Sequence, residues 1–299
     1  MSWQHAFIDQ LATLGPAPYL SGAQPASEPT ALAALALLGH HRIAEATPLL
    51  DWLAESQQPD GHVPVRRDPP RPGWTTALAS LAWSCARKIA GADYQRPLDE
   101  AAAWMLRIEG KAAPRQPQFG HDSTLVGWPW VNGTHTWLEP TVFHVLAFSA
   151  RGWSSHARAI EGRRVIADRV LPAGGANYGN TVVLGQMLLP HLQPSGLALL
   201  ALADSRGVRD ADSRIAATIA MLRREIGSTT APASLCWPLM GLAAHQALPA
   251  AHAAWLATAA ERPRLTPLEQ ALLLLADLGE KNPLVQVARD ATDAQEPSP

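Results

Sequence analysis

The chain has 299 residues and a formal net charge of −2 at pH 7, so it can bury a large core and offers no basic surface to nucleic acid. Its two cysteines, Cys85 and Cys236, are far apart, which excludes a disulfide framework and a four-thiolate zinc site. No early stretch has the pattern of a signal peptide and no apolar run is long enough to span a membrane, which predicts a soluble, cytoplasmic protein.

Apolar segments alternate with amphipathic segments along the chain. A segment that is apolar on every side predicts a helix buried on every side, and such segments occur at 30–38, 76–86, 141–150, 196–203, 233–244 and 267–278. After each comes a segment with one polar face, at 45–57, 97–108, 156–171, 212–226, 250–260 and 282–289. No segment shows convincing strand alternation. The sequence therefore predicts an all-α protein built from six helix pairs.

Six helix pairs can stack as an open superhelix or close into a ring. The inner helices of an open solenoid usually keep one polar face, whereas the apolar segments of this chain have none. This difference favours an (α/α)6 toroid, with six apolar helices inside and six amphipathic helices outside. We expect one toroid domain over residues 1–290 and a disordered C-terminal tail at 291–299.

Two loops carry family-like motifs, QQPDGHVPV at residues 57–65 and PAGGANYGN at residues 172–180. They resemble the Gln-x-x-Asp-Gly-x-Trp and Gly-Gly-Trp-Asn-Tyr loops of the prenyltransferase and squalene-cyclase repeat superfamily, whose fold is the α/α toroid. In that superfamily such loops join helix ends. The resemblance therefore implies a structural role for Gln57, Asp60 and Gly61.

The tripeptide Glu-Pro-Thr begins two distant apolar segments, at residues 28–30 and 139–141. Proline is tolerated in the first turn of a helix, so both glutamates belong at helix starts, where the helix dipole favours a carboxylate. We expect Glu28 to be a solvated cap and Glu139 to be more buried and to face the cavity. The resemblance implies that inner-helix starts line the mouth of that cavity, where the candidate ligand-binding residues are Glu28, Thr30, Trp74, Thr75, Glu139, Thr141, Cys236 and Trp237.

The connection HDSTLVGWPWVNGTHTWLEPT, residues 121–141, is long and rich in tryptophan. Long structured loops are often functional, and tryptophan faces can stabilise cationic or isoprenoid groups. The alternative is that these rings only plug one end of the barrel. Glu139 and Asp122 are the candidate acids, and the remaining candidate ligand-binding residues are Trp128, Trp130, Asn132, His135, Trp137, His144 and Tyr178. Histidines inside apolar helices, such as His144 and His245, are more often core residues than ligands.

The catalytic motifs of the resembled families are missing. There is no Asp-x-Asp-Asp, and the nearest string, Asp210-Ala-Asp212-Ser213, begins a polar-faced helix and predicts a cap. An Asp-Asp-x-x-Asp for magnesium diphosphate is also missing. SLCWPLMGLAAH, residues 234–245, is similar to the zinc-binding Asp-x-Cys-Tyr string of protein prenyltransferases, but Ser234 replaces the aspartate and the last inner helix begins without a histidine. We therefore expect no metal and no cofactor.

Two hypotheses follow. The first is a prenyltransferase-like or terpenoid-cyclase-like enzyme with an unusual site, which binds an isoprenoid or other apolar small molecule in a central cavity. The second is a catalytically inactive toroid that acts as a binding module or contacts a protein partner. Neither requires nucleic acid or a transmembrane segment, and both are compatible with peripheral membrane contact. An open apolar cavity favours the first, and a barrel filled with side chains favours the second.

Overall fold

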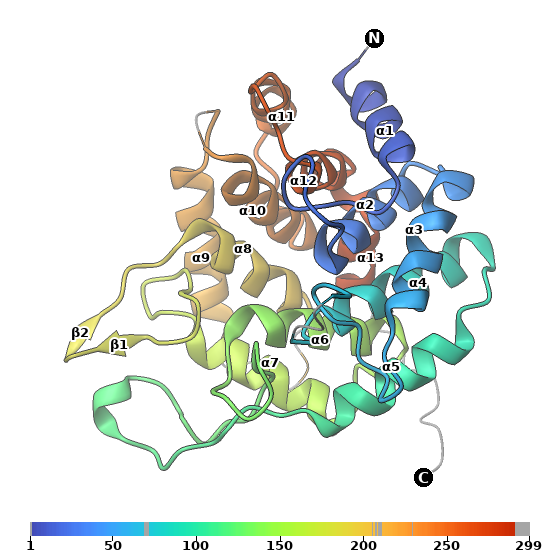
Figure 1. Cartoon of the computed structure of the whole chain (residues 1–299). Helices are drawn as coiled ribbons and strands as arrows, with labels where there is room; N and C mark the ends of the chain where they lie inside the picture. Colours follow the sequence, from blue (N-terminus) through green and yellow to red (C-terminus); the bar gives the residue numbers. More distant parts are fainter. Residues whose placement is uncertain are drawn as a thin grey trace.

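The computed structural model describes residues 2–68, 72–204, 206, 208, 211–228 and 230–290, and Figure 1 gives the arrangement of their helices. The expected tail at 291–299 lies outside the described residues, and so does Asp210. Asp212, from the same string, is the first residue of helix α9.

The apolar helices form a closed ring. Within the described chain each one contacts the next, and the last contacts the first. Every residue from Pro29 to Leu38 is buried, which explains why a segment without a polar face lies innermost. The structure thus confirms the all-α (α/α)6 toroid. The six inner helices are α2 (Ser27–Gly39), α4 (Thr76–Ala90), α6 (Leu138–Ala150), α8 (Leu192–Ala201), α10 (Pro232–Ala244) and α12 (Pro267–Asp277).

Five of the outer helices are the expected amphipathic ones, and each packs its apolar stripe on the ring. The sixth outer position is held by α1, at the start of the chain, which contacts α12 and α2 (Figure 1) and buries Phe7, Ile8 and Leu11. The sequence had placed residues 282–289 in that position, and this prediction was wrong. The outer helices are α1 (Trp3–Leu14), α3 (Ile43–Ser56), α5 (Gln95–Arg107), α7 (Ala157–Arg169), α9 (Asp212–Glu225) and α11 (His252–Ala260).

The last helix, α13 (Pro283–Arg289), covers the end of the barrel at which the inner helices finish. It follows α12 through the short 3-10 helix η3 (Gly279–Lys281) and contacts α2, α6, α8 and α10, which lie on different sides of the ring. Asn282 positions it: the buried amide donates to the carbonyl of Leu275 at 2.7 Å and accepts from the N–H of Leu284 at 2.8 Å. A Cβ at Gly39 would come within 2.4 Å of Leu278, so this closure also needs a glycine.

The other described elements are short. A second 3-10 helix, η1 (Pro117–Phe119), lies in the long connection before α6, and β1 (Val182–Val183) pairs antiparallel with β2 (Gln186–Met187) in a small hairpin that projects from the ring (Figure 1). None of the described helices combines the length and apolar character needed to cross a membrane. With one barrel end covered by α13, the other end, where the inner helices begin, is the place to look for a site.

Candidate functional site

A hydroxyl group marks the same position near the start of four inner helices. Each hydroxyl accepts a hydrogen bond from a backbone N–H in the preceding loop and donates to a carbonyl beside the helix start. All four residues are fully buried, so they join loop to helix and give the four repeats a common reference point. In these hydrogen bonds the N–H of Ala17 donates to the hydroxyl of Thr30 at 2.9 Å, that of Val63 to Thr76 at 2.8 Å, that of Trp128 to Thr141 at 3.0 Å, and that of Ala176 to Ser195 at 2.8 Å.

Two residues before each hydroxyl, the chain carries a side chain at the mouth of the barrel. These equivalent positions are Glu28 on α2, Trp74 before α4, Glu139 on α6 and Gln193 on α8. Sequence reasoning found the two Glu-Pro-Thr strings but missed Gln193. The signal was available, because Gln-Pro-Ser at 193–195 differs from Glu-Pro-Thr only by conservative changes.

Glu139 is a buried carboxyl group with a strongly shifted pKa. Its side chain is only 8% exposed, and the Nε2 atom of Gln193 lies 3.5 Å from its Oε1 atom. Burial first, and then the negative charge of Glu28, raise the pKa of Glu139 to about 8. Glu28 and Glu139 lie in the first turns of the inner helices α2 and α6, so both are at the end of the barrel where the inner helices begin.

Glu28 was expected to be a solvated cap without an aromatic neighbour, and this was wrong. The loop before α2 folds back through the Ala17–Thr30 hydrogen bond and places Tyr19 beside the carboxyl group. The Tyr19 hydroxyl donates to Glu28 Oε2 at 2.5 Å. Burial raises the pKa of Glu28, and the hydrogen bond from Tyr19 opposes that rise. Burial also raises the pKa of Tyr19, so the phenol keeps its proton and remains a donor.

Aromatic side chains contact one another inside the barrel beneath the mouth. The ring of Phe143 on α6 lies 5.6 Å from that of Trp237 on α10, and the two helices are not neighbours in the ring, so this contact crosses the barrel. Phe143 also stacks on Trp74 at 6.1 Å. Phe143 and Trp237 are both buried, and Cys236 beside them has no exposed surface. Of these predicted residues, Trp74 is the one that extends toward the mouth.

A groove of about 420 Å³ begins at Trp74. Trp130, from the long connection, meets Trp74 edge-on with ring centres 4.6 Å apart. Polar side chains share the groove with these rings: His62, whose ring nitrogen lies 2.6 Å from the carboxylate of Asp60, and the predicted Asn132. The groove thus combines aromatic faces with hydrogen-bonding groups, as small-molecule sites commonly do.

Other predicted ligand-binding residues have structural roles. Trp128 is fully buried, stacks on His144 with ring centres 4.9 Å apart, and donates from Nε1 to the carbonyl of Met105 at 2.9 Å. Burial lowers the pKa of His144 to about 3, so this histidine is a neutral core residue. Thr75 is also fully buried and donates to the carbonyl of Val63 at 2.7 Å.

Three further candidates lie on the loops around the mouth. Trp137 is half-buried and immediately precedes α6, next to Gly179. Tyr178 is 43% exposed, and its carbonyl accepts from the N–H of Leu138 at 3.0 Å. His135 is exposed and lines a separate cavity, described below.

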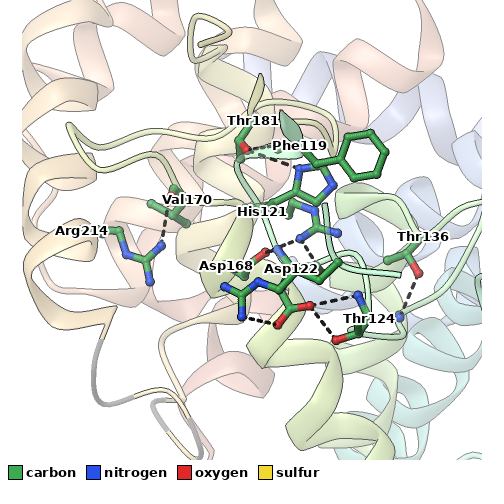
Figure 2. Close-up of polar contacts among 12 residues, drawn as sticks. Phe119, His121, Asp122, Thr124, Thr136, Asp168, Val170, Thr181 and Arg214 are labelled. Atoms are coloured by element: carbon green, nitrogen blue, oxygen red, sulfur yellow. Dashed lines mark hydrogen bonds and ion pairs between the residues drawn. The ribbon is translucent and has the colours of Figure 1, made fainter. Parts of the chain in front are cut away.

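Asp122 belongs to a polar cluster on the long connection, shown in Figure 2. Its Oδ1 atom accepts from the N–H and the hydroxyl of Thr124, at 3.0 and 2.6 Å, and Oδ2 lies 3.6 Å from Arg115. These hydrogen bonds hold the pKa of Asp122 below its usual range. The structure therefore argues against Asp122 as an acid, because a proton donor needs a raised pKa. Among the residues that the structure describes, no three metal-ligating side chains gather into a metal site.

Comparison with known proteins places the fold. No protein-family model matches the sequence, and no curated protein matches it. A solved glycosidase variant with a glutamate-to-alanine substitution, in complex with glucose, is similar over 94% of this chain and 97% of its own, with 12% identity and a TM-score of 0.58. A fragment of alpha-2-macroglobulin from Escherichia coli that runs from domain MG7 to the C-terminus is similar over 93% of this chain and 42% of its own, with 14% identity and a TM-score of 0.51.

These neighbours correct the family expected from the loops. The similar structures are named glycosidases and alpha-2-macroglobulins, so the expected relationship to prenyltransferases and squalene cyclases was wrong, as was the isoprenoid function drawn from it. At 12–14% identity the likeness establishes the toroid alone. The loop motifs misled because Gln57 and Gly61 serve the toroid rather than a particular chemistry. The Gln57 amide donates to the carbonyls of Gly61 and Pro97, at 3.0 and 2.9 Å.

Proposed function

We propose that this protein is a glycosidase whose active site is the mouth of the toroid, with Glu139 as proton donor and Glu28 as the second carboxylate. One observation carries the proposal. Two glutamates occupy equivalent helix starts, and the charge of Glu28 helps to raise the pKa of Glu139 to about 8. Glycosidases use a pair of carboxyl groups in this way, one protonated and one ionised. The likeness in fold to glycosidases over nearly the whole of both chains supports it.

The two carboxyl groups divide the reaction between them. Glu139 remains protonated at neutral pH and gives its proton to the glycosidic oxygen as the bond from that oxygen to the anomeric carbon breaks. Glu28 acts on the other side of the sugar ring as the second carboxyl group, and the hydrogen bond from the Tyr19 hydroxyl favours the ionised form that this role requires. Glu28 either takes a proton from the attacking water or attacks the anomeric carbon itself, and the configuration of the released sugar distinguishes these routes. In both routes one water molecule is consumed.

The groove beside Trp74 is suited to the rest of a saccharide. The rings of Trp74 and Trp130 offer apolar surface to the C–H face of a sugar, while His62 and Asn132 offer hydrogen bonds to hydroxyl groups. Beneath the mouth, the contact between Phe143 and Trp237 crosses the barrel. We therefore expect a substrate that lies across the mouth and into the groove.

The experiment incubates the protein with a panel of glucosides and gluco-oligosaccharides and measures hydrolysis as the release of reducing sugar. Glu139→Gln and Glu28→Gln should each lower the rate by about 10²–10⁴-fold while leaving the fold intact by circular dichroism. The matched control is Glu269→Gln, because Glu269 also begins an inner helix but is engaged in a capping box with Thr266. Full activity in Glu139→Gln, or a folded wild-type protein that cleaves no glycoside in the panel, would refute the proposal.

A further inference from the structure

A second cavity lies behind the long connection that precedes α6. Its volume is about 220 Å³, room for several water molecules. No carboxylate is among its lining residues, and its polar side chains are those of Lys111, His121, Ser123, His135, Thr136, Arg169 and Asn180. Residues 129–132 on the same connection line the groove beside Trp74, so the connection separates the two cavities.

Arg169 is the buried cation in the lining of this cavity. The side chain of this arginine, the last residue of α7, is 5% exposed. Its Nη1 atom donates to the carboxylate of Asp168 and lies 3.4 Å from the carbonyl of Asp122. Its Nε atom is buried and has no hydrogen-bond partner among the described residues. A buried guanidinium N–H without an acceptor is unfavourable, so the described residues leave part of the hydrogen-bonding capacity of Arg169 unused.

The charges around the cavity leave an excess of positive charge. Asp168 pairs with Arg169, and Asp122 lies 3.6 Å from Arg115, so these two carboxylates offset two cations. Lys111 remains. Its exposed ammonium group forms no ion pair with any residue that the structure describes, and its backbone N–H donates to the carbonyl of Thr134 at 2.8 Å.

Figure 2 shows how the wall of the cavity is fixed in place. The Thr181 hydroxyl lies 3.3 Å from the His121 ring and donates to the carbonyl of Phe119 at 3.0 Å. The carboxylate of Asp168 accepts from the N–H of Asp122 at 2.9 Å. Segments from before α6, from the end of α7 and from the loop after it are thereby joined around Arg169, so the donors are held ready for a ligand.

We propose that this cavity binds a tetrahedral oxyanion, a phosphate or sulfate group, either free or as an ester on a saccharide. Arg169 is the buried cation and Lys111 the second, with Ser123, His135 and Asn180 as further hydrogen-bonding groups. Guanidinium and ammonium groups are the side chains that recognise such oxygens most strongly. This site shares no residue with the carboxyl pair, and it does not rest on the glycosidase proposal.

Isothermal titration calorimetry with four probes tests the proposal: inorganic phosphate, sulfate, glucose 6-phosphate and, as the neutral control, glucose. The wild-type protein should bind the charged probes saturably. Lys111→Ala should weaken this binding by at least about tenfold, the loss of one charged contact, and Arg169→Lys should weaken it further. Lys281→Ala, which removes an exposed lysine elsewhere, and Glu139→Gln should bind as the wild type does.

The probes also identify the source of the anion. Tighter binding of glucose 6-phosphate than of phosphate indicates an ester on a saccharide, and equal binding indicates a free ion; both results support the site. If Arg169→Lys does not fold, Lys111→Ala and His135→Gln decide, because both side chains are exposed. The proposal is overturned if none of the charged probes binds saturably, if glucose binds as well as glucose 6-phosphate, or if Lys281→Ala loses as much affinity as Lys111→Ala.

Discussion

Replacing Glu139 by glutamine should change how the stability of the protein depends on pH. The pKa of Glu139 is about 8 in the folded protein against an ordinary 4.5, so between these values the folded state holds a proton that the unfolded state has released. Raising the pH through this window therefore favours unfolding. The free energy of unfolding should fall by about 1.4 kcal/mol per pH unit, or roughly 5 kcal/mol across the window, if other groups are unchanged.

The measurement is urea denaturation at intervals from pH 5 to pH 9. Glutamine cannot ionise, so Glu139→Gln should lack this part of the pH dependence, and its stability should exceed that of the wild type increasingly toward pH 8. Glu269→Gln, which keeps the polar atoms of its capping box, should retain the wild-type slope. Equal slopes for the wild type and Glu139→Gln would refute the assignment of a raised pKa, and with it the proton donor of the proposed mechanism.

Four further changes test separate parts of the structure. Glu28→Gln removes a charge that raises the pKa of Glu139, so the Glu139 carboxyl carbon, followed by NMR, should titrate at lower pH. Trp130→Ala should weaken oligosaccharide binding several-fold in calorimetry with little change in melting temperature, since its ring is only partly buried. Thr141→Val leaves the buried N–H of Trp128 without its acceptor and should cost about 1–3 kcal/mol in urea denaturation. Leu284→Ala, in the helix that covers one barrel end, should cost about 2–5 kcal/mol by the same assay.

The sequence was sufficient to predict the closed ring of inner helices but not which segment fills its sixth outer position. Helices that are apolar on all sides have one solution, burial at the centre, and α2 and α10 follow it. The first and last helices are different. Helix α1 is amphipathic, and helix α13 is short and mostly apolar. By sequence alone, either of them could pair with α12. Only the three-dimensional ring brings α1 back beside α12, which leaves α13 to cover the barrel end.

The site was predictable only where a local pattern repeated. Glu139 was found because Glu-Pro-Thr is specific for a helix start and a tryptophan-rich segment precedes it. Tyr19 was missed because its contact with Glu28 depends on how the first loop folds back. The unused nitrogen of Arg169 could not be foreseen, since it depends on how segments from three parts of the chain meet around it.

The place of α1 in the ring has a consequence for the synthesis of the protein. Translation produces this helix before the other helices of the ring, but one of the surfaces that cover Phe7, Ile8 and Leu11 belongs to α12, which begins at Pro267. At about 5–20 residues per second, the ribosome needs on the order of 10–50 seconds to reach it. Throughout that time the apolar face of α1 lacks its final cover and remains open to chaperones or to another nascent chain. Of the helices in the ring, the earliest to be made is thus among the last to be fully buried.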